Sequence, residues 1–330
     1  MDDRRQDNQA AAVVLWATAA TVVILALMSL FTAVIDIDLG LLLTDPDARH
    51  VLMISRIPRT LALILAGSAM AVAGLILQHL AQNRFIAPTT AGTVDAAAVG
   101  VLFSILLFPS APVMAKVLIA LLFALLGTAI FIGVVQRTRF RDPLLVPLLG
   151  LVLAGVYRAI AEFFAYRNNL TQSLDTWFNA DFSGIIAGRY ETLWLAGIAA
   201  LSAYVFANRL TAAGMGEAFA TNIGVSYRAT MAGGLAIASL ATAVVVVTVG
   251  AIPFLGLIVP NVVTLMLGDN LRRVLPITAM AGAALVLACD IVGRTVIFPY
   301  EIPVGTIVGV IGAGGFLVLV MRKGNRYAGA

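Results

Sequence analysis

The sequence predicts an all-α, polytopic membrane protein that forms a single domain over residues 1–330. Apolar residues make up 61% of the chain, charged residues only 12%, and the mean hydropathy is +1.00, whereas a soluble domain carries about 25% charged residues. The apolar runs are about 20 residues long, which suits helices that cross a bilayer, while barrel strands would alternate over about 10 residues. In the stretch 250–305, charges and helix breakers such as Asp290 and Pro303 interrupt an apolar run. Charges at such positions are costly in lipid and usually have a function.

The first apolar run, residues 11–35, follows Arg4 and Arg5. A cleaved signal peptide would have a shorter apolar core of about 7 to 15 residues, so we expect a retained first span. Cys289 is the single cysteine, which excludes an intramolecular disulfide. With only two histidines and no Cys/His cluster, we expect no metal site.

Cutting the chain at charge clusters and at Pro and Gly predicts about ten transmembrane helices. They lie at residues 11–35, 60–79, 91–108, 113–135, 144–165, 191–208, 229–250, 254–268, 274–293 and 303–321. The eighth is short and contains Pro260, so we expect it to tilt or break. An even number of spans puts both termini on one side, which would hold 13 of the 21 basic residues. The positive-inside rule therefore places both termini in the cytoplasm.

Motifs of an enzyme or of a nucleotide-binding protein are missing from the sequence. No G-x-x-x-x-G-K-[ST] is present, so any ATP would be hydrolysed by another subunit. Asp2 and Asp3 are adjacent but lie in the polar N-terminal tail, where they do not form a magnesium-binding motif of a membrane prenyltransferase. We therefore expect a chain that is not an enzyme, that holds no cofactor of its own and that has no nucleic-acid partner.

The loop after the sixth span predicts a short amphipathic helix in the cytoplasm. Gly216 and Glu217 suit the start of a helix, because an acidic residue is favourable in the first turn. Phe219 and Ile223 are four residues apart and share a face, and Gly224 suits the C-terminal cap. By itself the segment could equally be an ordinary connector.

Arginines stand at the outer ends of two spans. Arg56 and Arg59 flank Pro58 just before the second span, where Pro suits the first helical turn. Outer arginines oppose the positive-inside trend, and either snorkelling to lipid headgroups or a binding role would explain them. Asp290 and Arg294 lie one turn apart at the outer end of the ninth span, so we expect them to pair.

Arg158 and Glu162 have the same i, i+4 spacing within the fifth span, so they can pair and lower each other's burial cost. Counting 1.5 Å per residue from Leu144 puts them about 20 to 27 Å along the helix, toward its outer end. A structural ion pair and a substrate contact are both open for these two residues.

Several motifs together resemble the membrane permeases of bacterial ABC importers for iron siderophores and vitamin B12. They are R-x-P-R with the following L-A-x-x-x-A-G from Arg56 to Gly67, then Gly74–Gln78, Asn83–Gly92, Gly216–Val225 and Gly250–Gly305. The fourth is similar to the G-E-x-x-A-x-x-L-G-V pattern that contacts the ATPase in this family, with Ile223 in the Leu position. Pro260-Asn261 and residues 87–93 depart from the commoner family forms. Both departures resemble the branch that imports ferric catecholate or mixed siderophores such as petrobactin and anguibactin.

The resemblance implies the type II ABC importer permease fold, and a subunit that moves a ferric siderophore across the bacterial inner membrane by alternating access. Its implied partners are a second similar permease, two ATPase subunits that hold ATP and Mg, and an extracytoplasmic substrate-binding protein. An unlike second permease is favoured over a copy of this chain.

The resemblance also implies roles for individual residues. The residues implied to couple to the ATPase are Gly216, Glu217, Phe219, Ala220, Ile223 and Gly224. Those implied to dock the binding protein are Arg56, Arg59 and Arg294. Those implied as possible lining of the substrate pathway are Arg158 and Glu162. The alternative is an ion-coupled secondary transporter, in which Asp95, Glu162 and Asp290 would be proton or ion sites.

Overall fold

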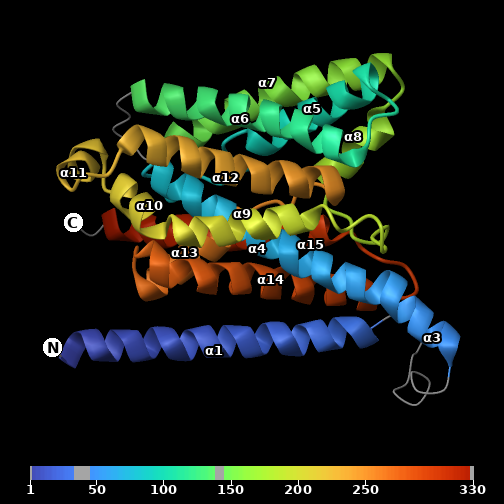
Figure 1. Ribbon diagram of the computed structural model, residues 1–330, viewed down its shortest axis with the longest axis horizontal. Coiled ribbons are helices and arrows are strands. Elements are labelled where there is room, and N and C mark those ends of the chain that lie inside the picture. Colours follow the sequence, from blue (N-terminus) through green and yellow to red (C-terminus); the bar gives the residue numbers. More distant parts are fainter. Residues whose placement is uncertain (1, 33–44, 138–144, 328–330) are drawn as a thin grey trace.

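The computed structural model describes residues 2–32, 45–137 and 145–327, and this part of the chain contains helices but no strand. The helices are α1 (Asp2–Phe31), α3 (Pro46–Val51), the π-helix η1 (Leu52–Arg56), α4 (Ile57–Leu80), α5 (Thr93–Leu107), α6 (Val113–Arg137), α7 (Leu145–Arg167), α8 (Thr171–Phe178), α9 (Leu193–Val205), α10 (Ala207–Gly214), α11 (Glu217–Asn222), α12 (Tyr227–Thr248), α13 (Leu255–Leu267), α14 (Leu271–Thr295) and α15 (Val304–Tyr327). The predicted all-α class is confirmed. Figure 1 shows the long helices side by side, with α1 along one edge of the bundle.

Each of the ten predicted spans coincides with a helix, but the helices differ in length. Within the described residues, six are long and apolar enough to cross a membrane, and α9 with α10 would add a seventh as a pair bent by 68°. Three further apolar helices, α5, α13 and the first part of α15, are shorter. The chain is thus a multi-pass membrane protein, while the number of full spans stays a prediction.

The two ends of the bundle differ in what they hold. α1 begins and α15 ends at the end where α11 lies, and α3 lies at the opposite end (Figure 1). Following the orientation predicted from the sequence, we call the first the inner end and the second the outer end. This arrangement agrees with the prediction that both termini lie on one side.

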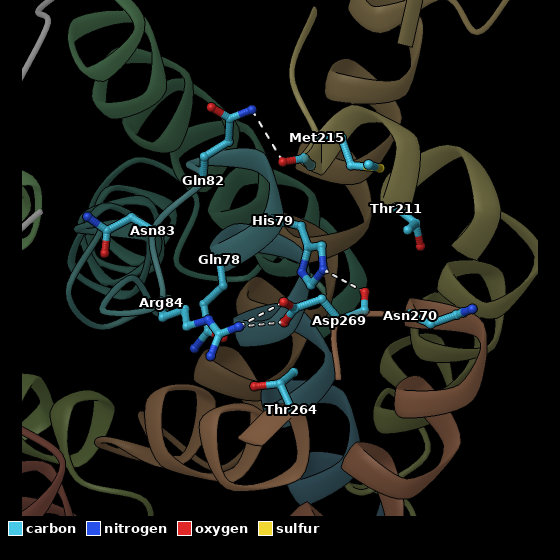
Figure 2. Close-up of a pocket in the computed structure, with 11 residues that line it drawn as sticks. Gln78, His79, Gln82, Asn83, Arg84, Thr211, Met215, Thr264, Asp269 and Asn270 are labelled. Atoms are coloured by element: carbon cyan, nitrogen blue, oxygen red, sulfur yellow. Dashed lines mark hydrogen bonds and ion pairs between the residues drawn. The ribbon is translucent and has the colours of Figure 1, made fainter. Parts of the chain in front are cut away.

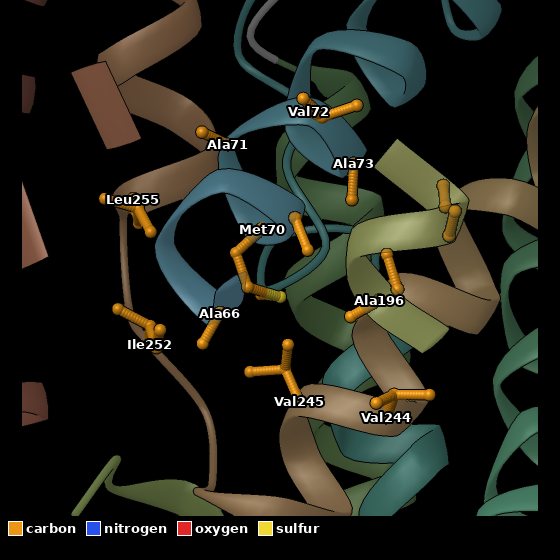
Figure 3. Packing of buried hydrophobic residues seen from close by; sticks show 14 of the residues in the cluster. Ala66, Met70, Ala71, Val72, Ala73, Ala196, Val244, Val245, Ile252 and Leu255 are labelled. Carbon is orange, nitrogen blue, oxygen red and sulfur yellow. The ribbon is translucent and has the colours of Figure 1, made fainter. Parts of the chain in front are cut away.

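The central helix is α4, which packs against α9, α12, α13 and α14. Figure 3 shows Met70 of α4 among Ala196, Val245, Ile252 and Leu255. Small residues let its backbone approach its neighbours, as is common between membrane helices. A Cβ atom on Gly74 would lie 1.9 Å from the carbonyl oxygen of Gly256 in α13. α4 therefore touches this neighbour backbone to backbone.

The second predicted span starts earlier than expected, because α3, η1 and α4 form one continuous helical segment from Pro46 to Leu80. Pro58 has no N–H and leaves the carbonyl of Ile54 without its helical partner. The N–H of Ala187, in the loop before α9, donates to that oxygen at 2.8 Å. The π-helix η1 ends just before Pro58, which fits the use of π-turns where the helical ladder is interrupted. The helix can therefore pass Pro58 without ending.

The predicted break at Pro260 is absent, since α13 is continuous from Leu255 to Leu267. The carbonyl of Gly256, which Pro260 leaves without a helical donor, lies 3.4 Å from the donor Nε2 of Gln78 in α4. Asn261 donates its Nδ2 to the carbonyl of Arg84 at 2.7 Å and ties α13 to the segment after α4. A side chain from another helix thus replaces the missing backbone bond.

The segment between α4 and α5 is not helical, yet Phe85, Ile86 and Ala87 are buried. Irregular backbone at membrane depth is tolerated where protein covers it. α5 begins after Gly92, whose φ of +74° favours glycine. A Cβ atom on Gly92 would lie 3.2 Å from a ring carbon of Tyr157 in α7. The first turn of α5, which contains Asp95, therefore meets the middle of α7.

Candidate coupling and pathway sites

The predicted cytoplasmic helix is present as α11, which is shorter than the loop that predicted it. Gly216 precedes it with φ +106° and Gly224 follows it with φ +79°, values that favour glycine. The N–H of Gly224 donates to Thr221 O at 3.0 Å, and the N–H of Val225 donates to Ala220 O at 2.9 Å. This pair of bonds is a Schellman motif, which ends the helix sharply.

α11 presents an apolar pair away from the bundle. Phe219 is 41% exposed and Ile223 is 54% exposed, while Ala220 is fully buried beneath them. Glu217 occupies the first turn, where its charge is favourable. Exposed apolar side chains on a short, well-capped helix are suited to contact another protein. The coupling role of these residues remains a prediction.

A cavity of about 480 Å³ lies at the inner end, beside the segment that leads into α11. Its lining residues are Gln78, His79, Gln82, Asn83, Arg84, Thr211, Gly214, Met215, Thr264, Asp269 and Asn270. They come from the end of α4 and the segment after it, from the C-terminal part of α10 and the residue after it, and from α13 and its connection to α14 (Figure 2). The sequence analysis did not identify this cavity.

Polar contacts tie the walls of the cavity together (Figure 2). Arg84 donates from Nη2 to both carboxylate oxygens of Asp269, at 2.7 and 2.9 Å. Gln82 donates its Nε2 to the carbonyl of Gly214 at 3.3 Å. Because Gly214 ends α10 and lies two residues before Gly216, this bond links the segment after α4 to the residues that lead into α11. Arg84 and Asp269 are 185 residues apart, so their spacing could not reveal the contact.

Charged side chains form a buried cluster at the outer end. The predicted Asp290–Arg294 pair is confirmed, with 2.5 Å between Oδ2 and Nη2. Arg59 of α4 binds the other oxygen of Asp290, with 2.7 Å between Nη2 and Oδ1. The same Nη2 lies 2.8 Å from Oε2 of Glu301, just before α15. Asp290 is 1% exposed, so two guanidinium groups enclose its charge.

Two arginines of this region also fasten α1. Arg56 donates its Nη1 to Leu30 O at 2.9 Å. Arg294 donates to the carbonyls of Ser29 and Thr32 and, at 2.8 Å, to the hydroxyl of Ser29. Cations are favourable at the carbonyl end of a helix, where backbone acceptors lack helical partners. Arg56 and Arg294 are 6% and 8% exposed, so both have a structural role within the chain.

The three arginines predicted to dock the binding protein are thus close to one another. Arg59 and Arg294 share Asp290, while Arg56 and Arg294 both bind the end of α1. Their docking role remains a prediction. The side chain of Arg59 is 14% exposed and its partner Glu301 is 31% exposed, so this pair lies nearest the outer surface.

The ion pair that the i, i+4 spacing allowed between Arg158 and Glu162 does not form. Arg158 instead has its Nε 3.6 Å from Oδ1 of Asp95, in the first turn of α5. Its guanidinium carbon lies 4.0 Å from the centre of the Phe178 ring, at the end of α8. Glu162 is exposed and makes no ion pair with the described part of the chain. The i, i+4 pair has the basic residue first, which is the weaker order in a helix.

The fold and these sites define a multi-pass membrane protein with an exposed apolar pair at the inner end and an enclosed charge cluster at the outer end. The model of the FecCD transport family matches residues 11–322, and the chain belongs to this family. The prediction of a siderophore-type ABC importer permease family is therefore confirmed.

Individual relatives cover almost the whole chain. It is 45% identical to the petrobactin import system permease protein YclN of Bacillus subtilis over 302 residues, 91% of this chain and 96% of that one. It is 43% identical to the petrobactin import system permease protein FatD of Bacillus anthracis, covering 92% and 89% of the two chains. It is 42% identical to the ferric-anguibactin transport system permease protein FatD of Vibrio anguillarum, covering 89% and 94%.

The fold has a counterpart among solved structures. A metal-chelate type ABC transporter in an inward-facing conformation superposes with a TM-score of 0.78, covering 94% of this chain and 99% of that one. The sequence identity is 22%, so this likeness concerns the fold. It confirms the predicted ABC importer permease fold.

Proposed function

We propose that this chain is the permease subunit of an ABC importer that carries a ferric siderophore across the bacterial cytoplasmic membrane, with both termini in the cytoplasm. The observation that carries the proposal is the identity of 42 to 45% to permeases named for petrobactin or anguibactin import. The proposed cargo is therefore a chelate of this class rather than vitamin B12 or haem. The energy comes from ATP and Mg bound by two separate ATPase subunits.

The ATPase contact is proposed on α11 and its caps. The residues are Gly216, Glu217, Phe219, Ala220, Ile223 and Gly224. Phe219 and Ile223 offer an apolar surface, and the two glycines hold the short helix in a fixed orientation. The bonds around the inner cavity would transmit a movement of α11 to α4, because Gln82, just after α4, is bonded to the end of α10.

A second, similar permease and an extracytoplasmic binding protein complete the proposed importer. We place the binding protein over the outer charge cluster, with Arg59 as the contact. Arg56 and Arg294 would support this surface indirectly by holding α1 in place. An acidic group on the binding protein could compete with Glu301 for Arg59, since that pair is partly exposed.

An ion-coupled carrier is the weaker alternative. Such a carrier needs intramembrane carboxylates that are free to bind and release an ion. Asp290 lies between two arginines, and Asp95 faces Arg158. Of the three candidates, Glu162 is the one without an ion pair in the described part of the chain, and one carboxylate makes a poor ion site.

The proposal is tested by purifying the assembly in mild detergent from the native host and reconstituting it in proteoliposomes. We expect two ATPase subunits and a second permease to copurify, and ferric petrobactin or anguibactin to enter when ATP and the binding protein are supplied. Uptake that needs an ion gradient and persists without ATP would contradict the proposal and favour the carrier.

A further inference from the structure

Arg158 lies deep within the membrane span and yet points out of the chain. It is about 20 Å along α7, a helix of 23 residues whose full length is about 34 Å. Its side chain is 49% exposed. Charges at this depth almost always face the bundle interior or a water-filled cavity, because exposure to lipid is costly. The face of α7 that carries Arg158 is therefore not a lipid-facing surface.

The guanidinium of Arg158 is only partly occupied by the chain. Asp95 approaches its Nε at 3.6 Å, and the ring of Phe178 covers one of its faces at 4.0 Å. Neither Nη atom makes a hydrogen bond with any residue that the structure describes. A guanidinium has five N–H donors in a fixed plane, and the N–H groups of the two Nη atoms of Arg158 are available to bind a ligand.

The groups around Arg158 are themselves held in place. Asp95 is buried in the first turn of α5. Phe178 ends α8, which is anchored by the buried Leu174 in an apolar cluster shared with α5 and α7. Figure 1 shows these three helices together at one side of the bundle. The orientation of Arg158 is therefore fixed by two separate elements.

The neighbouring charges on the same helix do not neutralise this edge. Glu162 is one turn nearer the outer end, is exposed and does not pair with Arg158. Arg167 is farther out and lies over Phe163, with 5.9 Å between its guanidinium carbon and the ring centre. The exposed face of α7 thus presents a single cation at mid-depth, beside an aromatic ring.

We propose that Arg158, oriented by Asp95 and Phe178, is a subsite on the transport path for an anionic oxygen group of the ferric chelate, either a carboxylate or a catecholate. The inference rests on the proposed function. The free edge of a guanidinium matches paired anionic oxygens, and it does so better than an ammonium group. Phe178 adds a surface on which an aromatic ring of the ligand can pack. Asp95 balances the charge while the site is empty.

The test compares R158Q and R158K with the matched control R167Q, which removes a cation of the same helix outside the site. Each variant is reconstituted with the second permease, the ATPases and the binding protein. Ferric petrobactin uptake, ATP hydrolysis stimulated by the loaded binding protein, and recovery of all subunits are measured together. Uptake depends on the path, whereas the other two readouts report docking, coupling and assembly.

We expect R158Q to lower uptake by roughly tenfold or more, since it removes a charge-assisted contact. Stimulated ATP hydrolysis and subunit recovery should stay near the wild-type values. Uptake by R158K should be intermediate, because lysine keeps the charge but not the planar guanidinium group. Uptake by R167Q should match that of the wild type. Wild-type uptake by R158Q overturns the inference, and so does loss of the second permease from R158Q, which would place Arg158 in the subunit interface. Failure of the wild-type assembly to take up any ferric siderophore would instead overturn the proposed function.

Discussion

α4 and α7 both carry arginines, but the surroundings of these arginines differ. The segment containing α4 has 78% of its most apolar window buried, and Arg59 reaches two carboxylates at 2.8 Å or less. The corresponding window of α7 is 22% buried, and Arg158 has one carboxylate at 3.6 Å. The first helix encloses its charge, whereas the second exposes it.

The difference indicates that the arginine of α4 stabilises the fold, whereas the arginine of α7 is available for transport. A buried charge with full partners stabilises a single arrangement, and removing one partner leaves the other charge uncompensated. A half-exposed charge with a loose partner contributes little to stability but is available to something outside the chain. We therefore expect substitutions near α4 to change stability and substitutions on α7 to change transport.

The largest effect on stability is expected for Asp290→Ala. Asp290 is enclosed by Arg59 and Arg294, so its removal leaves two buried cations facing each other. Breaking a buried pair costs about 3 to 5 kcal/mol. Thermal unfolding and yield in detergent measure the change. Glu162→Ala is the control on α7 and should unfold like the wild type; equal losses for both variants would erase the contrast between the helices.

A smaller effect is expected from adding one methyl group to α4. Ala at Gly74 would place its Cβ 1.9 Å from Gly256 O, so α4 and α13 must separate. Overpacking of this kind costs about 1 to 3 kcal/mol. Gly155→Ala on α7 is the matched control, because a Cβ atom added there would meet no described atom within 4 Å apart from its chain neighbours and the nearby backbone of its own helix. The midpoint of thermal unfolding should fall for the first variant and stay for the second; a fall for both would mean that α7 is more tightly packed than its exposure indicates.

The smallest change in stability is expected for Glu217→Lys at the exposed start of α11. It puts a cation at the positive end of the helix and alters the surface proposed for the ATPase. Transport and ATP hydrolysis stimulated by the binding protein should fall together, while thermal unfolding in detergent stays close to the wild type. Wild-type rates of both activities in proteoliposomes would remove α11 from the coupling path.

The two i, i+4 ion pairs show how far the sequence could predict these sites. Asp290 and Arg294 have the same spacing as Arg158 and Glu162, and only the first pair forms. The first has the acidic residue on the N-terminal side, which is the favourable order. The second competes with Asp95, which reaches α7 only because α5 begins inside the bundle after a buried, irregular segment. Spacing along the sequence can predict contacts within one helix, but it cannot predict where α5 begins and therefore which residue faces Arg158.

Helix positions were predictable because long apolar runs must span the bilayer, whereas the behaviour at prolines was not. Pro58 and Pro260 were each expected to start or break a helix. In both cases a donor from a distant part of the chain, Ala187 or Gln78, serves the carbonyl that the proline leaves. The inner cavity was missed for the same reason, since its walls come from separate segments.

The central claim is that the charged face of α7 lines an aqueous path in the assembled importer. Cys289 is the single cysteine and is buried, so a Cys289→Ala background allows one thiol to be placed at a time. Gly155→Cys and Glu162→Cys lie on the face of Arg158, and Leu201→Cys is an exposed apolar control on α9. Labelling with a charged, membrane-impermeant thiol reagent should modify the two α7 variants and spare Leu201→Cys, because only water carries the reagent to the thiol. If the α7 thiols in the intact assembly react no faster than Leu201→Cys, this face does not line the path.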